Sequence, residues 1–315
     1  MKKIVVLLSC YNGEKYLSCQ IDSILNQTLD DVELSLFIRD DGSLDSTKEI
    51  LKRYQKEYRN VQVIYGNNIG FVYSFFELIF LAKKRDFDFI AFSDQDDRWD
   101  SDKLKIAIEK IGLTDIPTLY ESTVRITDEN LNFKKIDQID AKPITFFNSA
   151  IQNFAAGHTY VFNRSLLDEI KENIDCSRIF VHDAFVHNVA VLKGKVIFDR
   201  VPHNDYRQHS CNVLGASKSK GMIGWIKKRL KRIRSGESKL YAKQILYYSD
   251  YFGDKMPPDF KRELTAFFKM QRNFFTRFIY ICKTKLYRQK RFETLSFKLL
   301  YLFGGFKISN EDSKK

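Results

Sequence analysis

The sequence has few cysteines, and they show no pattern of metal ligation or disulfide pairing. The five are dispersed along the chain, at Cys10, Cys19, Cys176, Cys211 and Cys282. An odd, scattered set suits a reducing compartment and argues against both a zinc site and a disulfide framework. A run of about 18 apolar residues, the length needed to span a bilayer, is also missing from the sequence.

The amino terminus superficially resembles a short signal peptide. Its apolar stretch, residues 4–8, ends at once in the polar sequence 9–13. A buried first strand is therefore the better interpretation. We expect the protein to lie in the cytosol unless another factor carries it elsewhere.

Positive charge is unevenly distributed along the 315 residues, whose net charge is +12. Residues 217–315 hold 25 Lys and Arg against 8 Asp and Glu, a balance of +17. Residues 1–216 hold 27 against 32, a balance of −5. A mildly acidic body thus carries a strongly basic tail, which points to an anionic partner such as a membrane surface, a nucleic acid or an acidic protein.

The first 125 residues alternate between strand and helix patterns. Apolar runs predict strands at 4–9, 34–39, 61–65 and 87–93. Helical periodicity predicts helices after them, at 14–27, 46–57, 71–82 and 103–111. This order predicts an α/β fold, with a mostly parallel sheet and helices on both faces. Further on, the pattern predicts a strand at 154–162, helices at 166–172 and 183–192, and a strand at 195–198.

The sequence pattern of the basic tail predicts helices, and the tail is rich in aromatic residues. Residues 222–234 place apolar side chains at helical spacing and fill the other faces with Lys and Arg. That pattern is typical of a helix lying on an anionic membrane surface. Residues 259–287 interleave Phe and Tyr with Lys and Arg. This longer segment suits membrane contact and a helical subdomain packed on the core equally well.

An acidic tetrapeptide, Asp94-Gln95-Asp96-Asp97, directly follows the strand predicted at 87–93. It therefore lies at the carboxyl end of a strand, where open α/β sheets bind ligands. Two carboxylates about 4 Å apart repel by roughly 4 kcal/mol, so such a cluster tends to take up protons or a cation. Carboxylate oxygens favour Mg²⁺, Mn²⁺ or Ca²⁺. A solvated loop or a helix cap is the alternative interpretation.

Two more loops are expected at the same edge of the sheet. Residues 9–13 offer Tyr11, a flat ring able to stack on a base, and Asn12. Residues 39–43 offer Asp40 and Asp41, whose carboxylates can accept a pyrimidine imide N–H or a ribose hydroxyl. The Gly-x-Gly-x-x-Gly fingerprint and the Walker A loop are absent, which argues against dehydrogenases and P-loop phosphotransferases. What remains is a nucleotide pocket that holds the diphosphate with a metal.

Seven ordered motifs within residues 1–216 resemble those of glycosyltransferase family 2, whose members have the GT-A fold. They lie at 9–13, 39–43 with Asp45, 68–70, 93–99, 157–159, 181–183 and 206–213. The combination of Ser93-Asp94-Gln95-Asp96-Asp97, His182-Asp183 and Tyr206-Arg207-Gln208-His209 is most similar to bacterial rhamnosyltransferase-type enzymes of surface polysaccharide assembly.

The resemblance implies a role for each matched residue. It implies Asp183 as the catalytic base that deprotonates the acceptor hydroxyl. It implies a site for Mn²⁺ or Mg²⁺ at Asp94, Asp96, Asp97 and His209. It implies that a nucleoside-diphosphate sugar is bound by Tyr11, Asn12, Asp40, Asp41, Asn68, Asp94 and Arg207.

The chain departs from the family pattern at two places. Relatives commonly carry an aliphatic residue where this chain has Arg98, which either pairs with a nearby carboxylate or points to solvent. Relatives often carry an aromatic pair after His-Asp, where this chain has Ala184-Phe185. Plainer roles also stay open for several residues: Asp183 as a helix cap, His187 as a packed side chain, and His209 as a structural residue.

These observations predict a metal-dependent, inverting glycosyltransferase. We expect a catalytic domain at 1–216, with a nucleotide-sugar half at about 1–125 and an acceptor half at about 126–216, and a helical region at 217–315. The expected donor is dTDP-rhamnose first and a UDP-sugar second. The expected acceptor is a lipid-linked or growing bacterial surface polysaccharide, reached at the inner face of the plasma membrane through 222–234. The alternatives are a nucleic-acid-binding protein and a catalytically inactive assembly partner; nucleic acid is not the expected partner.

Overall fold

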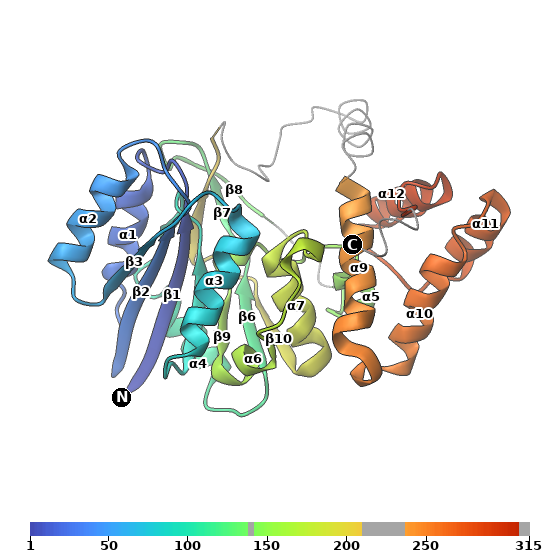
Figure 1. The fold of residues 1–315 in the computed structure, drawn as a ribbon, viewed down its shortest axis with the longest axis horizontal. Helices are drawn as coiled ribbons and strands as arrows, with labels where there is room; N and C mark the ends of the chain where they lie inside the picture. Colours follow the sequence, from blue (N-terminus) through green and yellow to red (C-terminus); the bar gives the residue numbers. More distant parts are fainter. Residues whose placement is uncertain (138–141, 210–236, 309–315) are drawn as a thin grey trace. The chain divides into compact units, whose positions relative to one another are not determined.

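The structure, a computed structural model, describes residues 1–137, 142–209 and 237–308 (Figure 1). The chain forms two compact units. The described parts of unit 1 are residues 1–137, 155–174 and 182–209, and those of unit 2 are residues 142–154, 175–181 and 237–308. The chain therefore enters unit 2 twice before it ends there.

Unit 1 is built on a seven-stranded sheet in the order β10-β6-β9-β4-β1-β2-β3. Strands β1 to β4 pair in parallel, as do β6 and β10, while β9 runs antiparallel to both of its neighbours. The bounds are β1 Lys2–Cys10, β2 Val32–Asp40, β3 Val61–Tyr65, β4 Phe89–Ser93, β6 Thr118–Ser122, β9 Val161–Asn163 and β10 Lys195–Asp199. The predicted α/β fold with a mostly parallel sheet is confirmed.

Helices cover both faces of this sheet (Figure 1). They are α1 Leu17–Leu25, α2 Thr47–Glu57, α3 Phe71–Lys83, α4 Lys103–Ile111, α6 Arg164–Glu169 and α7 His182–Lys193. Ile4, Val6 and Leu8 of β1 belong to the core cluster that includes α1, α2 and α4 side chains. Residues 5 and 7 alternate with them and are equally buried. A strand covered on both faces therefore appears in the sequence as an unbroken apolar run.

The predicted strand at 154–162 is wrong over most of its length. Residues Gly157–Thr159 form a 3₁₀ turn, η1, and only β9 continues as a strand. The amide of Gly157 donates to Asp183, 26 residues further along the chain, at 2.9 Å. A contact between distant residues thus sets this turn, and the local apolar pattern carries no trace of it.

A second, four-stranded sheet of unit 1 has the order β5-β11-β7-β8. Its strands are short: β5 Arg98–Trp99, β11 Asn204–Arg207, β7 Arg125–Thr127 and β8 Phe133–Ile136. β11 pairs antiparallel with β5. This pairing places the 204–209 segment beside the acidic tetrapeptide that precedes β5.

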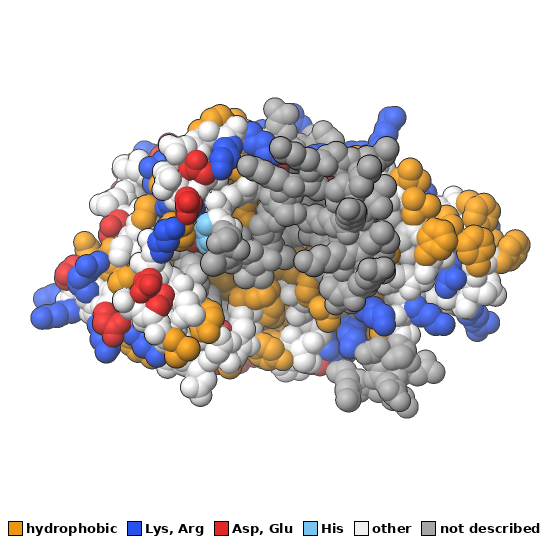
Figure 2. Space-filling model, turned by 90° about the horizontal axis from the view of Figure 1, so that it is seen from above, with side chains coloured by type: hydrophobic (Ala, Val, Ile, Leu, Met, Phe, Trp, Pro, Cys, Tyr) orange, Lys and Arg blue, Asp and Glu red, His pale blue; other side chains and the backbone are white. Residues whose placement is uncertain are grey.

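The regular elements in the described residues of unit 2 are all helices. Its elements are α5 Phe146–Ser149, η2 Cys176–Arg178, α9 Glu237–Phe252, η3 Gly253–Lys255, α10 Pro258–Lys269, α11 Phe274–Lys283 and α12 Arg291–Leu302. The segment predicted as one run at 259–287 is broken before α11, where Asn273 and Thr276 form a reciprocal capping box. Figure 2 shows hydrophobic side chains gathered on the surface of α11 and α12.

The helix predicted at 222–234 lies outside the described residues. Among the helices that the structure does describe, none combines the length and the apolar character that crossing a bilayer requires.

Candidate active site

Three loops meet at the carboxyl edge of the large sheet. Strands β1, β2 and β4 are neighbours, with Cys10 in register with Asp40 and Leu8 in register with Ser93. The loops that leave these strand ends therefore lie side by side. They hold the predicted residues 11–13, 40–43 and 94–97.

Asn12 joins the first two loops. It has a φ of 48°, in the left-handed region. Its amide donates to Ser43 Oγ at 2.9 Å, and its Oδ1 accepts from the amide of Leu44 at 2.8 Å. Asn12 thus holds the loop after β1 against the loop after β2, and a contact with the donor stays a prediction.

Tyr11 is tied by its backbone to the acidic loop. Its amide donates to Gln95 Oε1 at 2.9 Å, and Gln95 Nε2 donates back to its carbonyl at 3.2 Å. A Cβ on Gly13 would lie 2.6 Å from the same Gln95 oxygen, so only glycine allows this approach. The Tyr11 ring remains 41% exposed. Tyr11 is therefore accessible to a ligand, and its stacking on a nucleobase stays a prediction.

Asp40 and Asp41 are both buried at the end of β2. Asp40 accepts from the amide of Ser43 at 3.2 Å. Asp41 pairs with Arg39 at 2.5 Å and accepts the amides of Ile69 and Gly70 at 2.8 and 2.9 Å. Asp41 therefore fixes the loop after β3, which carries the exposed Asn68. The predicted base and ribose contacts of this group remain predictions.

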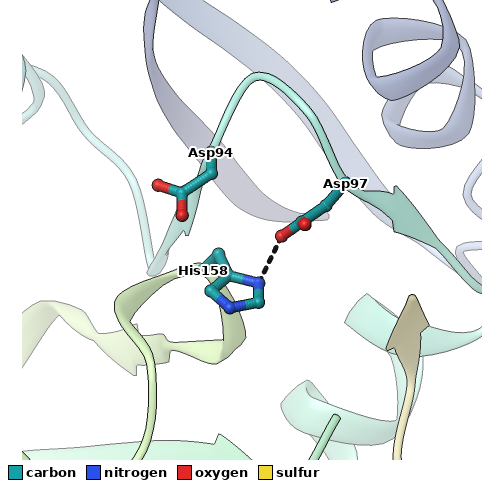
Figure 3. Close-up of side chains that lie close together, drawn as sticks. All are labelled: Asp94, Asp97 and His158. Atoms are coloured by element: carbon teal, nitrogen blue, oxygen red, sulfur yellow. Dashed lines mark ion pairs between the residues drawn. The ribbon is translucent and has the colours of Figure 1, made fainter. Parts of the chain in front are cut away.

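The acidic loop contains a buried ion pair. Asp97 is fully buried and pairs with Nδ1 of His158, from η1 (Figure 3). Asp94 lies beside them, and one ligand atom from each of the three residues lies within 4.8 Å of the others. The amide of Arg207 donates to Asp97 Oδ1 at 3.2 Å. Within the described residues, Nε2 of His158 is buried and has no hydrogen-bond partner.

The charges of this loop shift one another's titration. Burial, together with the neighbouring carboxylates, raises the pKa of Asp94 to about 7, against the opposing effect of His158. Burial and Asp97 also raise the pKa of Asp96 above its ordinary value. Burial alone would lower the pKa of His158, but the adjacent Asp97 carboxylate outweighs it and raises the pKa to about 9. Burial of the carboxyl groups is thus the largest cause of these raised pKa values, and repulsion between the carboxylates adds to it.

Asp96 has a histidine partner of its own. His209 Nε2 lies 2.7 Å from Asp96 Oδ2, and the His209 ring packs on Tyr16 with centroids 4.8 Å apart. The structure therefore brings His209 to the predicted acidic cluster, in contact with one carboxylate. Asp97 thus faces the imidazole of His158, which lies in η1. Asp96 faces the imidazole of His209, which follows β11.

Arg207 is buried and supports the acidic loop from β11. Its Nε donates to the carbonyl of Asp96 at 2.8 Å, and its Nη1 donates to the carbonyl of Glu129 at 2.6 Å. Its guanidinium also lies 4.5 Å from the centre of the Tyr16 ring. These contacts give Arg207 a positioning role, and the predicted phosphate contact stays a prediction.

Arg98, next to the acidic loop, pairs with Asp205 on β11. Its Nε and Nη2 lie 2.9 and 2.5 Å from Asp205 Oδ2. Asp205 Oδ1 also accepts from Arg125 at 2.6 Å. Of the two readings that the sequence left open, pairing with a carboxylate is therefore the one that the structure contains.

Asp183 lies in the first turn of α7 and is 6% exposed. Its Oδ2 accepts the amide of Gly157 at 2.9 Å, and its Oδ1 accepts the amide of Ala184 at 2.6 Å. A Cβ on Gly157 would lie 2.7 Å from Asp183 Cβ. Glycine at 157 is therefore what lets η1 approach this carboxylate. The negative charge of Asp183 makes a small contribution to the raised pKa of Asp94. A single site that includes both carboxylates stays a prediction.

The two histidines of this helix are packed in the interior. His182 is stacked on Phe75 with ring centroids 3.9 Å apart, and burial lowers its pKa to about 4. His187 lies 3.0 Å from Glu121 and is 1% exposed. The interpretation of His187 as a packed side chain agrees with this position.

His158 is the residue of this candidate site to which the sequence analysis gave no role. His158 belongs to the Gly157-His158-Thr159 motif, where the sequence pattern predicted a strand. The structure has a 3₁₀ turn there instead, and this turn places the His158 ring against Asp97. The usable signal was the small, conformationally permissive Gly157 immediately before a histidine.

The sheet, the acidic loop at the end of β4 and the carboxylate at the start of α7 define a glycosyltransferase of the GT-A type. The profile of glycosyl transferase family 2 matches residues 5–185, and the chain belongs to this family.

One sequence relative supports this assignment, and two solved structures share the fold. The chain is 30% identical over 256 residues to the dTDP-rhamnosyl transferase RfbG of Shigella flexneri, covering 78% of this chain and 85% of the relative. It superposes on S. aureus TarS 1–349, solved in complex with UDP, with a TM-score of 0.55 at 17% identity, covering 97% of this chain and 81% of TarS 1–349. It superposes on the mannosyltransferase PcManGT of Pyrobaculum calidifontis, solved with GDP-Man and Mn²⁺, with a TM-score of 0.53 at 14% identity, covering 96% and 85%. The chain is thus an enzyme, a family 2 glycosyltransferase.

Proposed function

We propose that the enzyme transfers a sugar, with inversion, from a nucleoside-diphosphate donor to a bacterial surface polysaccharide or its lipid-linked precursor. One observation carries the proposal. Asp94 and Asp97 lie with His158 at the carboxyl edge of the sheet, and Asp183 is close enough to Asp94 to affect its titration. A cation-binding group and a basic carboxylate in one site are what this reaction needs.

The acidic loop suits a hard divalent cation. Asp94 and Asp96 have raised pKa values, and His158 Nε2 is a buried nitrogen with no hydrogen-bond partner in the described residues. Asp94, Asp96 and Asp97, together with His209 or with His158 once it has lost its proton, would hold Mn²⁺ or Mg²⁺. The cation would neutralise charge on the departing nucleoside diphosphate.

Asp183 supplies the proton chemistry. One of its carboxylate oxygens accepts the proton of the acceptor hydroxyl, while the hydroxyl oxygen attacks the anomeric carbon of the donor. The new glycosidic bond forms as the bond from the anomeric carbon to the diphosphate oxygen breaks, and attack from the opposite face inverts the configuration. A general base of this kind typically contributes 10²- to 10⁴-fold to the rate. The amides of Gly157 and Ala184 hold the carboxylate in place.

The relative RfbG makes dTDP-rhamnose the first choice of donor, and the UDP complex of TarS makes a UDP-sugar the second. Tyr11, Asp40, Asp41 and Asn68 would line the nucleoside site, and Arg207 the diphosphate. Residues 1–125 would then bind the donor and residues 126–216 the acceptor. We place the reaction at the inner face of the plasma membrane, with residues 222–234 as one contact to anionic lipid, on the charge pattern of their sequence.

A panel of nucleotide sugars tests this proposal. Purified protein is incubated with each donor and Mn²⁺ or Mg²⁺, and release of the nucleoside diphosphate is followed. We expect release from dTDP-rhamnose above all, and its loss when the metal is chelated. Release that is equal with and without metal, or absent for every nucleotide sugar, would contradict the proposal.

A further inference from the structure

The helices α11 and α12 of unit 2 carry a group of large apolar side chains that face solvent. Each is between 46% and 75% exposed. We call this set the α11–α12 apolar face; its members are Phe274, Phe275, Phe278, Phe292, Leu295, Leu299 and Phe303. Single exposed apolar residues are common, but a contiguous set of this kind marks an interaction surface.

The helical spacing shows that these residues form continuous stripes. Phe274 and Phe278 are four residues apart on α11, and Phe292, Leu295 and Leu299 follow one another at three and four residues on α12. Figure 2 shows hydrophobic side chains gathered over both helices.

The opposite sides of the two helices make the core of unit 2. Tyr280 of α11 and Tyr301 of α12 pack with ring centroids 4.5 Å apart. Phe267 lies 5.1 Å from Tyr301, and Phe297 lies 5.4 Å from Phe306. Because the core is complete without them, the exposed stripes are not needed to hold the helices together.

The stretch of chain that carries this face is rich in positive charge. Residues 269–308 contain ten Lys and Arg and a single acidic residue, Glu293. Arg272, Lys283, Lys290 and Arg291 are exposed, and each lies within five residues of a member of the apolar face in the sequence. Anionic phosphates would therefore be attracted to the same side of unit 2 that offers aromatic and aliphatic side chains.

We propose that the α11–α12 apolar face binds the surface of an anionic lipid bilayer. The Phe and Leu side chains enter the boundary between headgroups and acyl chains, and the surrounding Lys and Arg contact lipid phosphates. Helices of 10 and 12 residues are too short to span a bilayer and suit an orientation in its plane.

The charge pattern favours lipid over the other occupants of such a face. A second copy of the chain would bring two strongly basic surfaces together, and the repulsion opposes that contact. This lipid site is distinct from the contact proposed for residues 222–234. It does not rest on the identity of the donor or on catalysis, so vesicle binding tests it apart from the proposed function.

The experiment uses the full chain and vesicles of phosphatidylcholine with or without phosphatidylglycerol. Flotation measures the partition coefficient of the wild type and of a variant with Phe275→Ser and Phe278→Ser. We expect binding to the anionic vesicles that weakens as salt rises, and a loss of at least about tenfold in the variant. The matched control is Leu113→Ser with Val201→Ser, which removes apolar side chains that are 84% and 56% exposed in unit 1. It should bind as the wild type does.

A fluorescent probe keeps the test valid if the double variant folds poorly. The chain has two tryptophans, Trp99 and Trp225, and Trp99 is buried. In a chain with Trp225→Phe and Phe278→Trp, the emission of the new indole should shift to shorter wavelength when anionic vesicles are added.

Three results would overturn the proposal. The first is equal vesicle binding by the wild type and the Phe275→Ser, Phe278→Ser variant, together with an unshifted emission of the probe. The second is binding lost only when the Lys and Arg of 222–234 are replaced. The third is that the face joins two copies of the chain: the wild type is a dimer and binds no vesicles, while the double variant is a monomer.

Discussion

Replacing His182 by phenylalanine should make the enzyme resist acid better. The His182 ring is 5% exposed, stacks on Phe75 at 3.9 Å and meets the edge of Phe92 at 5.3 Å. Within the part of the chain that the structure describes, neither ring nitrogen has a hydrogen-bond partner. A phenyl ring of similar shape can keep the stacking and loses no hydrogen bond.

The magnitude follows from the pKa of this histidine. Burial lowers the pKa of His182 from 6.5 to about 4, against the weaker opposing effect of Asp183. Between these two values the unfolded chain binds a proton that the folded chain does not, so stability is lost as the pH falls through this window. At pH 5 the loss is about 2 kcal/mol, and below pH 4 it approaches about 3 kcal/mol.

Urea unfolding at pH 7 and pH 5 measures this effect. The wild type should lose about 2 kcal/mol more than His182→Phe between the two pH values. Phe75→Leu is the control, because it weakens the same packing without removing the titrating group. It should lower the free energy of unfolding by the same amount at pH 7 and at pH 5. An equal loss in the wild type and in His182→Phe would refute the reasoning.

Three further substitutions test individual contacts of the site. Gly157→Ala places a Cβ 2.7 Å from the Cβ of Asp183; we expect kcat to fall at least about tenfold with donor affinity unchanged, measured by steady-state kinetics and titration. Asp41→Asn weakens one of the two carboxylate partners of the buried Arg39, which keeps Glu77, and should cost about 2 kcal/mol in urea unfolding; a loss near zero would contradict it. Arg98→Ala removes an ion pair in which Arg98 is half exposed, while the buried Asp205 keeps Arg125 as a partner. It should cost less than about 1 kcal/mol, with Mn²⁺ affinity unchanged; a large drop in that affinity would instead place Arg98 in the metal site.

The fold could be predicted because its buried strands appear in the sequence as continuous apolar runs. β1 is buried on both faces, so its apolar residues run without interruption, and the same holds for β4. Alternation of such runs with helical periodicity leaves few arrangements other than a parallel sheet. The loops that follow these strands then had to meet at one edge.

The partners of the site residues could not be predicted. His158 faces Asp97 because η1 turns where the sequence pattern suggested a strand. Arg98 meets Asp205, 107 residues further on, through the pairing of two short strands. Contacts of this kind depend on tertiary structure, and no local periodicity records them.

The most direct test of the proposed chemistry compares Asp183→Asn with Asp94→Asn. Donor affinity is measured by calorimetry with Mn²⁺ present, and turnover by release of nucleoside diphosphate. We predict that Asp183→Asn binds the donor as the wild type does but turns over at least about 100-fold more slowly, while Asp94→Asn loses metal-dependent donor binding. Wild-type turnover by Asp183→Asn would contradict its role as the base.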